Sequence, residues 1–242
     1  MASVRTGRLP TTPGRKDSLA QLSGEVTICA RCPRLVAWRE QVAREKRRAY
    51  RDCEYWGKGV PGFGDPHARV FILGLAPGAH GSNRTGRPFT GDSSGNFMYP
   101  VLHRTGFASQ PKGTHRGDGL VLTDAYITAA VRCAPPKNKP SPREIANCSP
   151  FLDRELALLP HVHIVVALGR IGFDAYLNHL KRLGVIASKA AYPFVHGAEY
   201  RTPDGRTLIA SYHPSNQNTN TGTLTEAMFT KVFERAARLV RS

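Results

Sequence analysis

Four short hydrophobic runs, each rich in β-branched residues, are spaced along the chain at residues 68–75, 120–131, 161–169 and 207–214. Their nearly continuous hydrophobicity predicts strands of a parallel sheet that is buried on both faces. Amphipathic patterns typical of helices lie between and after them, at residues 93–106, 141–159, 170–184 and 225–240. The alternation predicts an α/β fold, a three-layer α/β/α sandwich with a central, mainly parallel four-stranded sheet.

The N-terminal part has a different pattern. Residues 1–20 are rich in Arg, Pro, Thr and Gly, which predicts a disordered basic leader. A further helix is expected after Pro33, because Leu35, Trp38 and Val42 fall on one stripe with charged residues around it. No linker divides the remainder, so residues 21–242 are expected to form a single domain.

The charge balance favours a polyanionic partner. The 242 residues include 34 Lys and Arg against 18 Asp and Glu, a formal net charge of +16. Nucleic acid is the first expectation, while an anionic membrane surface, a ribosomal role or a merely basic protein stay open. The N-terminus has no apolar signal region and no stretch approaches a membrane span in length, so we expect a cytoplasmic protein.

Five cysteines are more typical of metal ligands, catalytic thiols or core residues than of disulfides in such a compartment. Cys29 and Cys32 form a C-x2-C pair, and Cys133 and Cys148 form a more widely spaced pair. Four thiolates suit tetrahedral zinc or a [4Fe–4S] cluster equally by count, with buried structural thiols as the alternative. Cys53 has no partner at ligand spacing and is expected in the core.

A Gly-rich stretch, residues 74–95, follows the first predicted strand. Its glycines let a backbone approach a ligand closely, although neither G-x-G-x-x-G nor the Walker lysine pattern is present. It contains His80, two arginines, Phe89 and Asp92. Phe89 suits stacking on a planar base or a place in the core. Asp92 suits stabilisation of positive charge or the N-cap of the next helix.

A second polar loop follows the last predicted strand. His213 and Pro214 end that strand and begin an Asn-rich stretch, residues 211–222. A lone histidine is often structural, but this one lies where an open α/β sheet gathers its functional residues, at the carboxyl ends of the strands. A structural and a functional role for His213 are equally open at this point.

Together, the stretch GLAPGAHGSNRTGRPFTGD, the His-Pro-Ser loop and four cysteines in this order resemble the family 5 (type B) uracil-DNA glycosylases, part of the uracil-DNA glycosylase superfamily. The likeness extends from Cys29 to the C-terminal helix. It implies a [4Fe–4S] cluster held by Cys29, Cys32, Cys133 and Cys148. It also implies catalytic roles for Asp92, His213 and Asn138, and a base pocket lined by Gly74, Ala76, Gly78, Phe89 and Ala129.

Two departures within the superfamily bear on the substrate. Many relatives have an acid or amide after the first strand, where this chain has Leu75 and Ala76, and an Asn on the second strand, near Ala129. A buried amide left unpaired is what rejects wrong bases, so its loss implies relaxed specificity. The resemblance accordingly implies action on uracil, hypoxanthine and some modified pyrimidines in double-stranded DNA.

The expected activity is that of a monofunctional glycosylase in base excision repair, because no nucleophilic lysine is evident in the motifs. Asp92 would stabilise the positively charged sugar and position water, His213 would stabilise the departing base, and the loop residues Asn216, Gln217 and Asn218 would enter the duplex. A monomer associated with the nucleoid is expected. The alternative is a non-catalytic or covalently trapping uracil-DNA-binding protein, although the basic insertion of trapping members is missing. A zinc hydrolase is disfavoured because no HExxH pattern occurs.

Overall fold

The computed structural model describes residues 17–241. The strands are β1 (Phe63–Gly64), β2 (Val70–Gly74), β3 (Ala125–Ala129), β4 (Ile164–Leu168), β5 (Glu199–Arg201) and β6 (Thr207–Ser211). The α-helices are α1 (Leu19–Ile28), α2 (Pro33–Glu45), α3 (Ser82–Thr85), α4 (Ser93–Arg104), α5 (Pro142–Leu158), α6 (Arg170–Arg182), α7 (Asn216–Asn220) and α8 (Glu226–Arg241). Two 3-10 turns are η1 (Arg48–Tyr50) and η2 (Pro136–Asn138).

The strands form one six-stranded sheet in the order β1-β3-β2-β4-β6-β5. Its inner pairs β3–β2, β2–β4 and β4–β6 are parallel, whereas β1 and β5 join the two edges antiparallel. The predicted α/β class with a mainly parallel sheet is confirmed, and the four inner strands lie within the four hydrophobic runs. The edge strands escape prediction because two or three residues show no periodicity.

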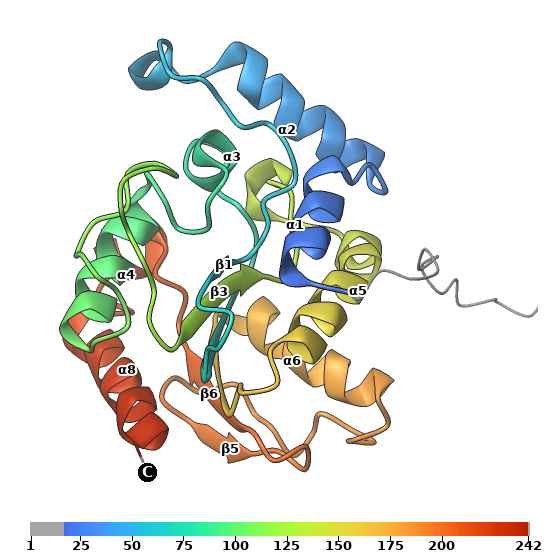
Figure 1. Cartoon of the computed structure of the whole chain (residues 1–242), viewed down its shortest axis with the longest axis vertical. Helices are drawn as coiled ribbons and strands as arrows, with labels where there is room; N and C mark the ends of the chain where they lie inside the picture. Colours follow the sequence, from blue (N-terminus) through green and yellow to red (C-terminus); the bar gives the residue numbers. More distant parts are fainter. Residues whose placement is uncertain (1–16, 242) are drawn as a thin grey trace, which may run out of the picture.

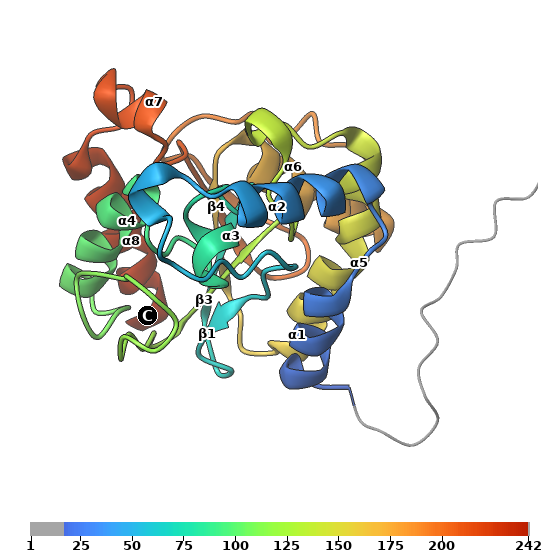
Figure 2. The ribbon, with the colours of Figure 1, turned by 90° about the horizontal axis from the view of Figure 1, so that it is seen from above.

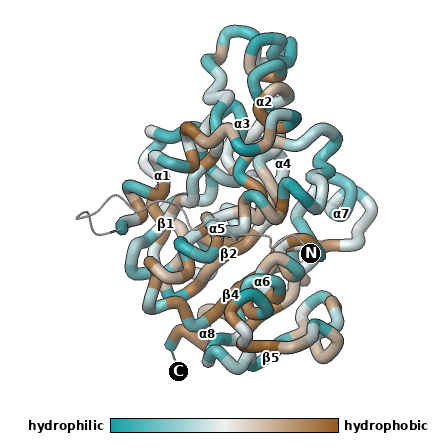
Figure 3. The backbone as a smooth tube through the Cα atoms, turned by 90° about the vertical axis from the view of Figure 1, so that its right-hand side faces the viewer, coloured by the Kyte–Doolittle hydropathy of each residue, from teal (hydrophilic) through white to brown (hydrophobic). Residues whose placement is uncertain are grey.

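Helices α4 and α8 lie on one side of the sheet, and α5 and α6 lie on the other (Figure 1). Alternate residues of β2 pack against the two layers. Val70 and Ile72 of β2 lie in the cluster that includes residues of α4 and α8, while Phe71 and Leu73 lie in the cluster that includes residues of α5 and α6. All four side chains are fully buried. Both faces of the sheet are therefore covered, which is why the strand sequences are hydrophobic throughout. Figure 3 shows hydrophobic backbone concentrated along β2, β4 and α8.

The N-terminal boundary differs from the prediction. Residues 1–16 of the predicted leader lie outside the described residues, but the remainder of it belongs to the fold. Ser18 caps α1 by accepting a hydrogen bond from the Gln21 amide at 3.2 Å. Asp17 forms an ion pair with Arg154 of α5 at 2.8 Å. Helix α1 escaped prediction because its start falls within the predicted leader, and it packs through Leu22 and Val26.

The helix expected after Pro33 is confirmed as α2, which ends at Glu45. Among the described helices, none is long and apolar enough to cross a membrane. The parallel strands β2, β4 and β6 end at the same edge of the sheet, where they lead into the loops that begin at Leu75, Gly169 and Tyr212. In Figure 2, α2 and α3 lie in front of the sheet. The functional residues are expected at this edge.

Candidate active site

Phe89 and His213 belong to loops far apart in the sequence, and their rings contact each other. The ring centroids are 5.8 Å apart, with planes tilted by 31°. Phe89 also lies against the end of β2, where a Cβ on Gly74 would stand 3.0 Å from the ring. His213 lies against Gly169, after β4, where a Cβ would stand 3.1 Å from the His213 Cβ. The two rings therefore lie over the carboxyl ends of neighbouring strands.

Phe89 is held in an unusual backbone conformation. Its φ of 50° is in the left-handed region, which costs a bulky residue of order 1–3 kcal/mol. The Phe89 amide donates to the Ser82 hydroxyl at 3.1 Å. Its carbonyl lies so close to Gly95 that a Cβ there would stand 1.8 Å from the oxygen. The side chain is 9% exposed and joins the core through part of its surface.

Asp92 caps helix α4 with one carboxylate oxygen. Its Oδ1 accepts a hydrogen bond from the Gly95 amide at 2.9 Å, so the N-cap alternative is correct. The other oxygen, Oδ2, lies over the Gly-rich stretch. A Cβ on Gly78 would stand 3.1 Å from this oxygen, and a Cβ on Gly81 would stand 1.9 Å from it. The cap therefore leaves Oδ2 for a second role, and glycine at 81 is required to accommodate it.

Burial shifts the pKa of both titratable groups toward their neutral forms. It raises the pKa of Asp92, although the amides of Gly95 and Ser94 and the charge of Arg84 act in the opposite direction. It lowers the pKa of His213 to about 4. The imidazole of His213 is consequently neutral near pH 7, with one N–H to donate.

Arg84 holds the Gly-rich stretch together, a role that the sequence did not reveal. Its Nε donates to the His80 carbonyl at 2.8 Å, and its Nη2 donates to the Gly91 carbonyl at 2.8 Å. The guanidinium lies 4.1 Å from the ring centroid of Tyr50. This role could not be predicted because donors to backbone carbonyls leave no periodic signal in a sequence.

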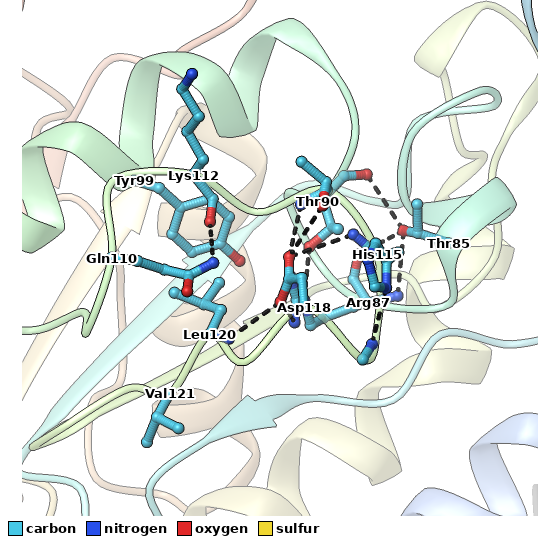
Figure 4. A network of polar contacts seen from close by, with 12 residues as sticks. Thr85, Arg87, Thr90, Tyr99, Gln110, Lys112, His115, Asp118, Leu120 and Val121 are labelled. Carbon is cyan, nitrogen blue, oxygen red and sulfur yellow. Dashed lines mark hydrogen bonds and ion pairs between the residues drawn. The ribbon is translucent and has the colours of Figure 1, made fainter.

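The second arginine, Arg87, forms a buried ion pair with Asp118 at 2.6 Å, with side chains 4% and 6% exposed (Figure 4). Asp118 also accepts from the amides of Thr114 at 2.7 Å and Leu120 at 3.1 Å. Burial alone would raise the pKa of Asp118, but the hydrogen bonds from Arg87 and the amides lower it well below its usual range. The pair fixes the loop at 114–120 to the Gly-rich stretch.

The remaining predicted pocket residues lie at or near the same edge. Ala129 ends β3 opposite Gly74 of β2. The Gly78 carbonyl accepts from the Asn83 amide at 3.0 Å, which closes the turn next to Asp92. Ala76 packs against a cluster of buried cysteines. The structure therefore brings Gly74, Gly78 and Ala129 to the Phe89–Asp92 region and places Ala76 on the side of the cysteines.

Asn138 is not brought into this group. It lies in η2 with an exposed side chain and a φ of 55°, and no contact within residues 17–241 links that side chain to Asp92 or His213. The Asn-rich loop after His213 is in fact the short helix α7, which Ser215 caps. Asn218 donates to the His213 carbonyl at 2.9 Å, whereas Asn216 and Gln217 are exposed.

The comparison with known families bears on this arrangement. Residues 61–237 match the family model described as "Uracil DNA glycosylase superfamily". The chain belongs to this superfamily. The resemblance seen in the motifs is thereby confirmed at the level of the superfamily.

Individual members of the uracil-DNA glycosylase superfamily are similar over most of the chain. A "Type-5 uracil-DNA glycosylase" from Thermus thermophilus is 57% identical over 88% of this chain and 94% of the relative. Proteins of the same name from Pyrobaculum aerophilum and Mycobacterium tuberculosis are 48% and 45% identical, over 86% and 93% of this chain and over 88% and 83% of the relatives. A "Type-4 uracil-DNA glycosylase" from P. aerophilum is 31% identical over 67% of this chain and 74% of that protein.

In this superfamily member, three of the four predicted ligand cysteines share one buried cluster. Cys32, Cys133 and Cys148 pack with Leu35 and Val131, and Cys29 is half-buried in the adjoining cluster. Burial raises the pKa of the Cys133 thiol against the opposing charge and hydrogen bond of Arg39, and the nearby Cys29 and Cys32 act in the same direction as burial. All four thiols therefore lie in one neighbourhood.

Two side chains donate hydrogen bonds to these sulfurs. The Nη1 of Arg39 donates to the Sγ of Cys133 at 2.9 Å, and the Nδ2 of Asn147 donates to the Sγ of Cys32 at 3.4 Å. Soft sulfur donors in an apolar lining, with N–H groups directed at the sulfurs, fit an iron–sulfur cluster. In the part of the chain that the structure describes, no group of three or more His, Cys, Asp or Glu residues is arranged to hold a single metal ion.

Cys53 lies apart from these four. It is half-buried, and its amide donates to the Tyr50 carbonyl at 3.1 Å. None of the hydrophobic clusters within residues 17–241 includes its side chain, so the expectation of a core thiol is met only in part.

Proposed function

We propose that this protein is a monofunctional uracil-DNA glycosylase of family 5 that excises uracil from double-stranded DNA in base excision repair. The similarity to type-5 enzymes over most of the chain supports this. The observation that supports it most is the contact between the Phe89 and His213 rings at the carboxyl ends of the central strands, with Asp92 three residues after Phe89 in the chain. An aromatic ring, a neutral imidazole and a carboxylate are the groups that hydrolysis of a sugar–base bond requires.

The nucleotide must leave the helical stack before it can react. Extrusion costs a few kcal/mol, and a mismatched G·U pair lowers that cost. The exposed part of the Phe89 ring would then stack on the extruded base, and the exposed residues Asn216 and Gln217 would fill the space that it vacates. Base–aromatic stacking contributes about 1–3 kcal/mol.

Asp92 acts on the sugar. As the bond to the base breaks, positive charge develops on the sugar ring and negative charge on the base. The Gly95 amide fixes Oδ1, and Oδ2 lies against Gly78 and Gly81, so the carboxylate has little freedom to move. It stabilises the sugar cation and orients the attacking water. Release leaves an abasic site with the strand intact.

His213 acts on the base. Its pKa of about 4 keeps the imidazole neutral near pH 7, and its one N–H donates to the oxygen on which negative charge develops. Such donors contribute about 10²–10³ in rate in acyl-transfer sites.

The predicted base-binding residues support broad base specificity. Gly74 and Ala129 are paired in register at the ends of β2 and β3, and neither has a side chain able to hydrogen-bond a base edge. Without a buried amide to be left unpaired, a site discriminates weakly between bases. Hypoxanthine and some modified pyrimidines are therefore proposed as further substrates.

A [4Fe–4S] cluster held by Cys29, Cys32, Cys133 and Cys148 is the proposed cofactor. When bound, it would cross-link the start of α2, the segment after β3 and helix α5. Within the chain, Arg39 and Asn147 would hold the Cys133 and Cys32 sulfurs in place. The proposed state is a monomer in the cytoplasm, associated with the nucleoid.

The test is incubation with a duplex that contains one G·U pair, followed by alkali and a denaturing gel. Strand scission only after alkali is expected, because an abasic site is alkali-labile. Scission without alkali would contradict a monofunctional enzyme. A stable protein–DNA adduct, or an unchanged strand, would refute the proposal in favour of a trapping or a binding protein.

A further inference from the structure

The segment that follows α2 forms the outer wall of the Gly-rich stretch. The Trp56 amide donates to the Arg84 carbonyl at 2.9 Å, and the Gly57 amide donates to the Asn83 carbonyl at 3.0 Å. The hydroxyl of Tyr55 is 3.0 Å from the Nδ1 of His80. Residues 46–58 are therefore attached to the same stretch that positions Asp92.

This segment presents cations that no carboxylate neutralises. Arg47, Arg48 and Arg51 are exposed, and none of them forms an ion pair with another residue of the described chain. Nearby acids, Glu45 and Asp52 among them, are exposed as well. Basic residues still outnumber acidic residues along the segment. Figure 3 shows the part of the molecule around α2 as mainly hydrophilic. A basic excess of this kind attracts phosphate groups.

Two further cations lie on the faces of one aromatic side chain. The guanidinium of Arg116 is 4.3 Å from the ring centroid of Trp56, and the ammonium of Lys58 is 5.5 Å from it. An aromatic face orients a cation without cancelling its net charge, so the N–H donors stay available to an anion. Arg116 belongs to the loop that the Arg87–Asp118 pair holds in place (Figure 4).

Contacts of Arg84 join these cations to the active site. Arg84 donates to the carbonyl of Gly91, the neighbour of Asp92, and stacks on Tyr50 of η1. Arg47 lies close enough to His80 that its charge, after burial, lowers the pKa of that imidazole. The cationic residues are therefore continuous with the mouth of the site and do not belong to a separate face.

We propose that Arg47, Arg48, Arg51, Lys58 and Arg116 form a surface, here called the flanking-strand surface, that binds backbone phosphates of the duplex beside the extruded nucleotide. The proposal rests on the proposed function for the identity of the damaged site, and on charge and position for the phosphate contacts. Phosphate contacts fix the register of a protein on DNA without reading sequence. The surface would hold the duplex so that the damaged nucleotide faces Phe89.

The experiment compares two double variants that remove equal charge. Arg47→Ala/Arg48→Ala alters the flanking-strand surface. Arg238→Ala/Arg241→Ala alters the exposed end of α8, at the opposite edge of the sheet, where Arg69 before β2 donates to the Val240 carbonyl at 3.0 Å. Binding of an undamaged duplex is measured by fluorescence anisotropy over a range of salt concentrations. Thermal unfolding confirms that each variant is folded.

Wild type and the α8 variant are expected to share one slope of log K against log salt. The Arg47/Arg48 variant should show a slope smaller by about 1 to 2, with binding weakened by about 10-fold near physiological salt. Lys58→Ala/Arg116→Ala is a second variant of the same surface, for use if the first does not fold. It should show the same reduction in slope and affinity as the Arg47/Arg48 variant. The proposal would be overturned if the α8 variant lost as much DNA affinity and salt dependence as the Arg47/Arg48 variant. It would also be overturned if the slope stayed at the wild-type value in both variants of the flanking-strand surface. Because undamaged DNA is used, failure of wild type to release uracil would refute the proposed function alone.

Discussion

The carboxylate of Asp92 lies so close to Gly81 that a Cβ on this glycine would stand 1.9 Å from Oδ2. No side-chain rotation relieves such an overlap while Oδ1 stays bonded to the Gly95 amide. The glycine is therefore a condition for the position of this carboxylate oxygen. This relationship links a sequence feature, the glycine content of residues 74–95, to the chemistry of one atom.

Gly81→Ala should displace Oδ2 and lower single-turnover uracil release by about 10²-fold, a size typical of losing a positioned acid or base. The measurement is the release rate at saturating enzyme. Gly24→Ala is the matched control, because a Cβ there meets no atom within 4 Å. The control should keep the wild-type rate. A Gly81→Ala protein that is equally active would show that Oδ2 has no fixed role.

The pH dependence of the uracil-release rate should follow the protonation of Asp92, and not that of a histidine with an ordinary pKa. Because burial raises the Asp92 pKa, the rate should fall on the acid side with an apparent pKa above 3.8. Asp92→Asn keeps the helix cap and should remove this acid limb along with most of the rate. A limb near 6.5 that persists in Asp92→Asn and disappears in His213→Ala would contradict a neutral imidazole.

Stability should also depend on His213 in mildly acidic solution. The folded pKa of His213 is about 4 against an ordinary value of 6.5, so between these pH values the unfolded chain binds the extra proton. Wild-type stability should therefore fall as the pH decreases through this window. His213→Ala should lose less stability over the same range, measured by urea unfolding. Parallel losses in both proteins would argue against the lowered pKa.

Asp118→Asn should destabilise the protein strongly, because it leaves the Arg87 guanidinium buried without its charge partner. The expected loss is about 3–5 kcal/mol in the free energy of unfolding. Asp65→Asn is the control, because Asp65 forms no ion pair with another residue of the described chain. It should lower the free energy of unfolding by less than Asp118→Asn does. Since the folded pKa of Asp118 is lowered, its contribution is present above the unfolded value of 3.8 and is lost as the pH falls below it.

The cysteine cluster gives a prediction with an optical readout. Protein purified without oxygen should show broad visible absorbance, which Cys133→Ser should abolish or strongly reduce while lowering the unfolding temperature. Cys53→Ser changes the cysteine that lies apart from the cluster, and should retain both properties. Equal absorbance in all three proteins, or in none, would count against the proposed cofactor.

Much of the fold could be predicted from the sequence because its strands are hydrophobic on both faces. Phe71 and Ile72 point into opposite layers and are both fully buried, so the run that contains them predicts a central parallel strand. Edge strands β1 and β5 and helix α1 offered no such pattern. Helix α7 was missed because Asn and Thr favour turns as readily as helix ends.

The site was predicted less completely than the fold. Phe89, Asp92 and His213 were identified, and the structure brings their surroundings together at one edge of the sheet. Gly169 was not, although its φ of 85° and its contact with His213 make it part of the same site. Arg84 and Arg39 were also missed, because they act through contacts to a carbonyl and a sulfur that depend on tertiary structure.

The most direct test of the account is single-turnover uracil release from a G·U duplex by Asp92→Asn and His213→Ala, with binding of the same duplex measured alongside. We expect both variants to bind DNA nearly as wild type and to release uracil at least about 10²-fold more slowly. Near wild-type release by both variants would show that these two groups do not perform the chemistry.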